Sequence, residues 1–183
     1  LMGQGRAKPP LNQVTGVARL NEDPPRRGLP ATPVNFHSAF IGSPGTGKTT
    51  FARFYTQQIR GLGLLPRGHL VEVSRADLVA EYVGQTAART AKVIESALGG
   101  VLFIDEAYAL KQGKDDGFGQ ECIDTIVKEM EDHREELVVI FAGYSAEMRD
   151  FLRQNSGLES RVPHVIEFED FDDEALGAIL DAF

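Results

Sequence analysis

The residues from Gly42 to Thr49 have the types and spacing that a phosphate-binding loop needs. They read Gly-Ser-Pro-Gly-Thr-Gly-Lys-Thr and match the pattern G-x-x-x-x-G-K-[ST] in full. The glycines let the backbone curl until several N–H groups point at one anion, and a following helix adds its positive end. In such loops the lysine, here Lys48, reaches the terminal phosphates, and the hydroxyl of Thr49 binds Mg²⁺.

This motif, which we call the phosphate loop, predicts binding of a nucleoside triphosphate with Mg²⁺. The residues predicted to contact the nucleotide here are Pro44, Gly45, Thr46, Gly47, Lys48, Thr49 and Thr50. The simpler alternative is a glycine-rich turn at the start of a helix with an incidental lysine.

Two carboxylates, Asp105 and Glu106, follow directly after the apolar run 101–104. In phosphate-loop enzymes an aspartate at the end of such a strand holds the Mg²⁺ shell, so Asp105 is a candidate metal residue. Glu106 is the candidate that orients or deprotonates the attacking water. The alternative is a strand followed by a solvated acidic turn. Beside the phosphate loop, this acid pair favours hydrolysis of ATP. A GTPase would need an Asn-Lys-x-Asp guanine reader, which the sequence lacks.

These motifs belong to a chain in which strand-like and helix-like apolar patterns alternate. Short apolar runs predict strands at 37–41, 70–73, 101–104, 137–141 and 165–168, and helical spacing predicts helices at 48–62, 86–98, 122–133 and 146–154. We also expect a weak helix at 11–20 and the start of a last helix at 172–183. The alternation predicts an α/β fold, a parallel five-stranded sheet covered by helices on both faces. Ligands bind such sheets at the carboxyl ends of the strands.

Length and composition bound the class of protein. The chain has 183 residues and a formal net charge of −8, which fits one domain and argues against general nucleic-acid binding. The lone cysteine, Cys122, excludes an internal disulfide and is expected to be a packing residue on a helix. No apolar run is long enough to cross a bilayer, and no signal peptide is recognised, so we expect a cytoplasmic protein without membrane contact.

The chain resembles the AAA+ ATPases, a class of phosphate-loop NTPase. Within that class it is similar to the CbbX/CfxQ and stage V sporulation protein K group, and the AAA+ domain of EccA secretion components is nearly as similar. The motifs that carry this resemblance are 42–50 and 101–108, with further agreement at 61–65, 75–79, 143–144 and 157–161. The resemblance covers nearly the whole chain. It implies ATP as the nucleotide, Mg²⁺, a homo-hexameric ring and a protein client. For the CbbX branch that client is inhibited rubisco, whereas close relatives have no link to carbon fixation.

The resemblance also implies roles for residues that spacing alone does not reveal. Met2 and Gly3 would lie beside adenine. Tyr82, Val83 and Gly84 match the loop that lines the central pore and grips a polypeptide. Arg161 matches the arginine finger that one subunit gives to the ATP of its neighbour. The structural alternatives are that Tyr82 packs beneath a loop and that Arg161 forms a surface ion pair.

The sequence departs from the family pattern in three places. The first sensor position, often asparagine, falls near Tyr144, so no sensor is assigned. Glu159 stands where relatives often carry a second arginine, so Arg161 alone would act as the arginine finger. The helical lid begins only at residue 172 and is largely absent, which would weaken ATP binding and hexamer formation. The expected organisation is therefore an N-terminal segment at 1–35, an ATPase core at 36–171 and the start of a lid at 172–183.

Three functions remain open from the sequence. The first is an ATP-driven remodelling ring that acts on a protein client. The second is a nucleotide-regulated assembly ATPase of a secretion system with low turnover. The third is a phosphate-loop kinase for a small substrate, which would depend neither on Arg161 nor on oligomerisation.

Overall fold

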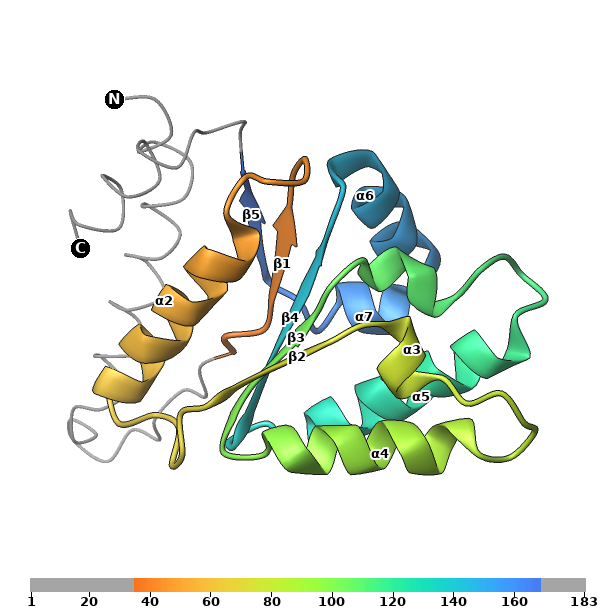
Figure 1. Ribbon diagram of the computed structural model, residues 1–183, viewed down its shortest axis with the longest axis horizontal. Helices are drawn as coiled ribbons and strands as arrows, with labels where there is room; N and C mark the ends of the chain where they lie inside the picture. The colour runs from red at the N-terminus through yellow and green to blue at the C-terminus, as the bar shows by residue number, and fades with distance from the viewer. Residues whose placement is uncertain (1–34, 169–183) are drawn as a thin grey trace, which may run out of the picture.

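Five parallel strands form the central sheet in this computed structural model, which describes residues 35–168 (Figure 1). The strands are β1 (Ser38–Ile41), β2 (Leu70–Val73), β3 (Gly100–Ile104), β4 (Leu137–Gly143) and β5 (His164–Glu167). Their order across the sheet is β2-β3-β4-β1-β5, and every pairing is parallel. The predicted fold class is confirmed, and each predicted strand is present to within two residues at either end.

Helices cover both faces of this sheet, as predicted. They are α2 (Lys48–Gly61), α3 (Arg75–Leu78), α4 (Thr86–Ala97), η2 (Ala107–Leu110), α5 (Gly117–Asp132), α6 (Ser145–Gln154) and α7 (Ser156–Glu159). Figure 1 shows α2 on one face of the sheet and α4 and α5 on the other. Each crossover from strand to parallel strand needs a helix, because parallel neighbours cannot be joined by a tight turn.

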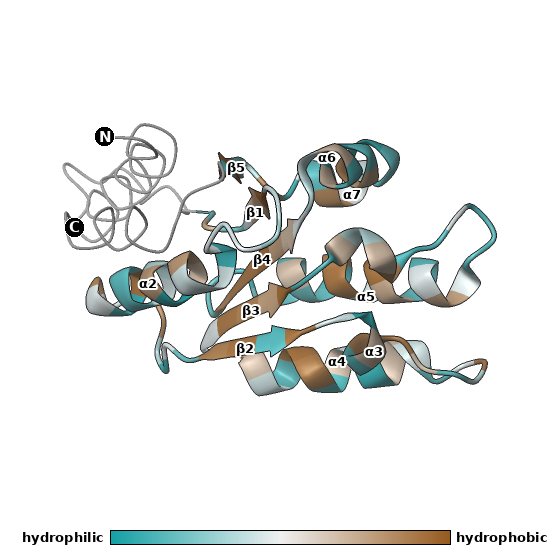
Figure 2. Ribbon diagram, turned by 45° about the horizontal axis from the view of Figure 1, so that its top comes forward, coloured by the Kyte–Doolittle hydropathy of each residue, from teal (hydrophilic) through white to brown (hydrophobic). Residues whose placement is uncertain are grey.

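The core consists of two apolar clusters, one on each face, because alternate residues of a strand point to opposite sides. On the α2 side Phe40 packs with its ring centre 5.7 Å from that of Phe51 and 5.8 Å from that of Tyr55. On the opposite side Ile41 and Phe141 join apolar residues of α3 to α7. Figure 2 shows apolar residues along β1, β3 and β4, the strands that both clusters bury.

Cys122 lies fully buried in the cluster on the side opposite α2, and burial raises the pKa of its thiol to about 11. It is therefore a packing residue, as expected.

The start of α5 differs from the sequence prediction, which placed it at residue 122. The helix begins five residues earlier because the Asp116 side chain accepts a hydrogen bond from Gly119 N at 3.0 Å and caps its first turn. Two glycines in that turn, Gly117 and Gly119, disguise the helical pattern. Glycine is needed at 119, since a Cβ there would collide with the Leu110 carbonyl oxygen.

Three short elements, α3, η2 and α7, were not predicted. The signal for α3 is a capping box, in which Ser74 precedes the helix and Asp77 occupies its third position. Asp77 Oδ2 accepts a hydrogen bond from Ser74 N at 2.9 Å.

Four predicted features lie outside the described residues: the helix at 11–20, Met2, Gly3 and the lid start at 172–183. Within residues 35–168, no helix combines the length and apolar character that a membrane span requires.

A buried histidine ties β1 to β4. His37 is 5% exposed, and its Nδ1 accepts a hydrogen bond from Val139 N at 2.9 Å, so the ring is neutral in the fold. Burial, and to a smaller extent the nearby His164, lower the pKa of His37 to about 4. Between pH 6.5 and 4 the unfolded chain therefore binds a proton at this position that the folded chain does not bind.

This difference predicts a loss of stability in acid. The contribution of His37 is complete above pH 6.5 and falls by about 3 kcal/mol as the pH drops to 4. In His37→Asn the amide oxygen can replace Nδ1 as the acceptor for Val139, but the side chain no longer titrates. Urea unfolding between pH 7 and 4.5 should show a shallower pH slope for this variant than for the parent. Equal slopes would contradict the assignment.

Candidate functional site

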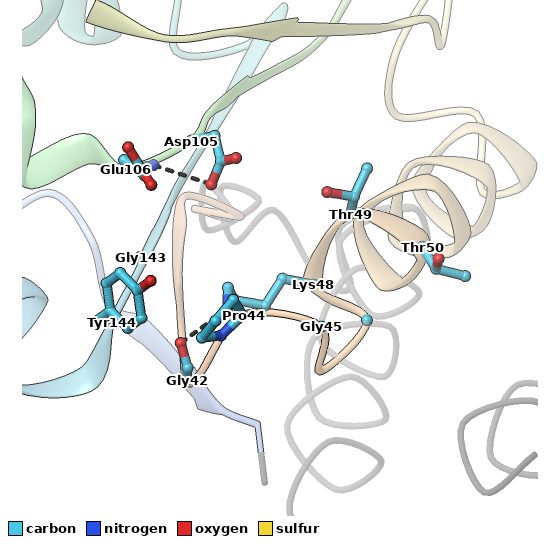
Figure 3. Close-up of a pocket in the computed structure, with 11 residues that line it drawn as sticks. Gly42, Pro44, Gly45, Lys48, Thr49, Thr50, Asp105, Glu106, Gly143 and Tyr144 are labelled. Carbon is cyan, nitrogen blue, oxygen red and sulfur yellow. Dashed lines mark hydrogen bonds between the residues drawn. The ribbon is translucent and has the colours of Figure 1, made fainter. Parts of the chain in front are cut away.

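One cavity at the carboxyl edge of the sheet contains both chemical motifs found in the sequence (Figure 3). Its volume is about 370 Å³. The residues that line it are Gly42, Pro44, Gly45, Gly47, Lys48, Thr49, Thr50, Asp105, Glu106, Gly143 and Tyr144. They come from the ends of β1, β3 and β4 and from the start of α2. The predicted edge of the sheet is therefore where the phosphate loop and the acid pair meet.

The phosphate loop presents unpaired backbone donors to this cavity. Gly47 adopts a left-handed conformation (φ 87°) as the N-cap of α2, and no side chain caps the helix. The first N–H groups of a helix have no partner within it, so those of Lys48, Thr49 and Thr50 are available to an anion. Gly45 is also left-handed, with φ 73° and open space where a Cβ would stand. This cradle fits a chain of phosphates.

Backbone contacts anchor the base of the loop to the sheet. Gly42 N donates to Gly143 O at 3.0 Å, which joins the end of β1 to the end of β4. A Cβ at position 42 would lie 2.6 Å from Phe168 O, so this position requires glycine. Within the loop, Thr46 Oγ1 donates to Ser43 O at 2.7 Å. The loop is therefore held in shape by its own chain.

The ammonium group of Lys48 folds back over the loop, as Figure 3 shows. Its Nζ donates to Gly42 O and to Ser43 O, both at 2.8 Å. Burial lowers the pKa of Lys48, and the carboxylate of Asp105 opposes that shift. A half-buried cation beside open backbone donors is the arrangement that favours phosphate oxygens.

The acid pair leaves the end of β3 with an unusual backbone. Asp105 N donates to Val73 O at 2.9 Å, and Asp105 Oδ1 accepts from Glu106 N at 3.0 Å. Glu106 has φ 48°, and no other residue except glycine has a positive φ in the part of the chain described. A left-handed residue with a Cβ costs about 1–2 kcal/mol, and such strain often occurs at functional sites. Here the turn sends the exposed Glu106 side chain to the cavity.

Two cavity residues, Gly143 and Tyr144, were not predicted as site residues. Both follow the apolar part of β4, whose end lies beside that of β1. The sequence signal was the strand end itself, but its place in the sheet depends on strand order. Tyr144 is 39% exposed, and its ring centre lies 6.2 Å from that of Tyr108. Burial first, and then the nearby charge of Glu106, raise the pKa of Tyr108.

The predicted client-binding residues lie on a protruding loop outside the cavity. We call residues 79–85, between α3 and α4, the Tyr82 loop. Tyr82 is 68% exposed and Val83 is 89% exposed, so the alternative in which Tyr82 packs beneath a loop is wrong. Gly84 has φ 80° in the turn of this loop. An exposed tyrosine offers apolar area with few stereochemical demands.

Arg161 also lies outside the cavity. Its Nε lies 3.1 Å from Glu131 Oε1, and its Nη1 donates to Gly157 O at 2.9 Å. The ion pair that the sequence left open as an alternative is therefore present. Glu159, two positions before Arg161, is exposed. Within this chain Arg161 does not reach the phosphate loop.

The residues present fit a magnesium ion that is shared with phosphates. No group of three or more His, Cys, Asp or Glu side chains in residues 35–168 is arranged to hold a metal by itself. Mg²⁺ in nucleotide sites commonly uses only one or two protein ligands and completes its shell with phosphates and water. Thr49 and Asp105, which line the same cavity, can provide that minimal set.

Comparison with known proteins gives one consistent result. The model of the family described as ATPase family associated with various cellular activities (AAA) matches residues 38–170. Stage V sporulation protein K of Bacillus subtilis is 45% identical over 171 residues, 93% of this chain and 53% of that protein. The ESX-1 secretion system protein EccA1 of Mycobacterium tuberculosis is 46% identical over 96% of this chain and 31% of its own length. Protein CbbX of Cereibacter sphaeroides is 41% identical over 96% of this chain and 57% of its own length. The chain thus spans about half, or less, of the length of these relatives.

The backbone of Glu106 leads to a stability prediction. Glycine adopts φ 48° without strain, whereas alanine keeps the Cβ that causes it. The free energy of unfolding, measured with urea, should therefore be about 1 kcal/mol higher for Glu106→Gly than for Glu106→Ala. Glu135 is an exposed control without a positive φ. There glycine should be the less stable of the two replacements. Equal stabilities at position 106 would show that no strain is stored there.

Proposed function

The chain belongs to the AAA family of ATPases, and from that premise we propose that it hydrolyses ATP to remodel a protein client as part of a ring of identical subunits. The observation that carries this proposal is the single cavity that the phosphate loop shares with the acid pair. Such a cavity brings phosphate binding, a metal position and a base for water within reach of one another.

Each residue of the cavity takes a role set by its chemistry. Lys48 and the open N–H groups of α2 bind the β- and γ-phosphates of ATP. Thr49 and Asp105 would hold Mg²⁺, which would supply positive charge to the phosphates. Glu106 accepts a proton from a water that attacks the γ-phosphorus, and the bond to the β-phosphate oxygen breaks to give ADP and phosphate. The exposed position of Glu106 leaves it accessible to that water.

Arg161 acts in trans in this proposal. A guanidinium stabilises the charge that develops on the transferred phosphoryl group, and its planar donors suit phosphate oxygens. Arg161 lies outside the cavity of its own chain, which supports a role at the cavity of a neighbouring subunit. Its contacts with Glu131 and Gly157 hold it until a neighbour docks.

The Tyr82 loop grips the client. Tyr82 and Val83 form an exposed apolar tip that can hold many polypeptide sequences, as a general remodelling protein requires. We place the protein in the cytoplasm, with a protein client and no nucleic acid. The net charge of −8 supports the last point.

A low-turnover assembly ATPase is the second candidate. The similarity to an ESX-1 secretion system protein and the in-chain ion pair of Arg161 favour it. Tight ATP binding with negligible turnover would support this candidate over a remodelling ATPase. Copurification with a Glu106→Gln trap would identify the client in either case, whether inhibited rubisco or a secretion component.

Replacement of the proposed base separates binding from turnover. Glu106→Gln keeps the size of the side chain but removes its proton-accepting charge. It should bind ATP with unchanged affinity and hydrolyse it more slowly, on the order of 10²–10⁴-fold. Calorimetric titration and phosphate release measure the two effects. Glu135→Gln, which changes an exposed glutamate elsewhere, should behave as the parent, and parental turnover in Glu106→Gln would refute the role of the base.

Mixed subunits test the action of Arg161 in trans. Arg161→Ala should lower turnover by on the order of 10³-fold, and Lys48→Ala should abolish it. In a 1:1 mixture, about a quarter of the interfaces in a closed ring combine an intact Lys48 with an intact Arg161, so activity should return. Mixtures that remain inactive would count against a shared site, whereas full activity of Arg161→Ala by itself would favour a kinase that acts as a monomer.

A further inference from the structure

A half-buried guanidinium joins the segment after the acid pair to the helix that precedes the Tyr82 loop. Arg75, the first residue of α3, reaches the C-terminal end of η2. Its Nη1 lies 2.9 Å from the carbonyl oxygens of both Ala109 and Leu110, and 2.6 Å from Asp116 Oδ2. The side chains of Arg75 and Asp116 are 27% and 9% exposed. A shielded contact of this kind is weakly screened by salt and geometrically specific.

Asp116 is fixed in place independently of Arg75. Its carboxylate also accepts hydrogen bonds from Gln112 N at 2.8 Å and from Gly119 N at 3.0 Å. The hydrogen bond from Arg75 is the main reason that the pKa of Asp116 is lowered to about 2. The carboxylate therefore stays charged at neutral pH, and Arg75 has a rigid partner on the α5 side.

The phosphate side of this connection is short. η2 begins at Ala107, directly after Glu106, and Ala109 N donates to Glu106 O at 2.8 Å. The carbonyl groups that Arg75 contacts thus belong to the same turn as the acid pair. A displacement of Asp105 and Glu106 toward bound phosphates would move η2 with them.

The client side is equally direct. α3 ends at Leu78 and continues into the Tyr82 loop. Thr90 Oγ1 donates to Leu78 O at 2.9 Å, and Ala80 N donates to Thr86 Oγ1 at 3.1 Å, so α4 holds the end of α3 and the start of the loop. The loop, α3 and the acid pair border one cavity of about 690 Å³, which leaves space for them to shift relative to one another.

We propose that Arg75 is a positioning residue that transmits movement of the acid pair, through η2 and α3, to the Tyr82 loop. The proposal rests on the proposed function, because bound nucleotide supplies the movement. Arg75 does not line the cavity that contains the phosphate loop. Its loss should leave nucleotide binding intact and remove the response of the loop.

The chain has no tryptophan, so Tyr82→Trp provides a single fluorescent reporter at the exposed tip of the loop. In this parent, saturating Mg²⁺ with ADP, or with ATP, should change the emission of the introduced indole and its quenching by acrylamide. Calorimetry with ADP measures binding separately.

Arg75→Met in the reporter chain should keep ADP affinity within about threefold and lose the fluorescence response. Asp116→Asn should weaken the response while it retains the helix cap, since asparagine also caps helices. Arg75→Lys should respond partially, because one ammonium cannot reproduce the planar donor set. Arg53→Met, which removes an exposed ion pair with Glu72, is the matched control and should respond as the parent.

A full response in Arg75→Met and Asp116→Asn would overturn the proposal, and so would a parent that binds ADP without a change in the fluorescence of the reporter. Failure of the parent to bind any nucleotide would instead refute the proposed function. In that case, amide hydrogen exchange measured without nucleotide tests whether Arg75 couples η2 to the Tyr82 loop. Arg75→Met must speed exchange in both 107–110 and 78–82 for the connection to stand, and acceleration in only one of them overturns it.

Discussion

The parallel pairing of β1, β3 and β4 is the constraint on which the rest of the structure depends. Because the strands run in one direction, their carboxyl ends meet at one edge, and the loops that follow them share one cavity. The register is equally important: Ile41 lies opposite Gly143, and Ile104 opposite Phe141. A slip of one residue would exchange the two faces of a strand and remove its apolar side chains from their clusters. Burial of both faces therefore fixes the positions of the phosphate loop and the acid pair.

Electrostatics at this edge are arranged in opposition. The start of α2 and Lys48 supply positive potential, and Asp105 and Glu106 supply negative charge across the cavity. Lys48 donates to two carbonyl oxygens of its own loop. A triphosphate with Mg²⁺ complements both sides at once, since its oxygens suit the donors and its metal suits the carboxylates. The donors of the phosphate loop suit the phosphates, so that motif by itself predicts binding. Hydrolysis also needs the carboxylates, so it is favoured only when both motifs are present.

The sequence predicted those features that local physics determines. The strands were found because buried strands in a parallel sheet are continuous apolar runs, and the phosphate loop was found because its chemistry needs adjacent residues. The start of α5 was missed because glycines at 117 and 119 conceal a helix that Asp116 caps. The contact from Arg75 to Asp116 spans 41 positions in sequence and depends on how η2 packs, so no local pattern reveals it. The position of Tyr144 in the cavity likewise depends on the order of the strands.

The Tyr82 loop leaves two adjacent apolar side chains, Tyr82 and Val83, exposed to solvent. Burial of a valine or tyrosine side chain typically gains about 1.5–3 kcal/mol, and the fold forgoes that gain at two adjacent positions. Yet the loop is not loosely attached, because Thr86 and Thr90 fasten its start and Arg89 donates to carbonyl groups of α3. A flexible tip could bind a polypeptide, but it could not pull one, since force requires a stiff connection to the nucleotide site. An exposed apolar tip on a firmly held base therefore supports the proposal that the loop moves a client rather than only binding one.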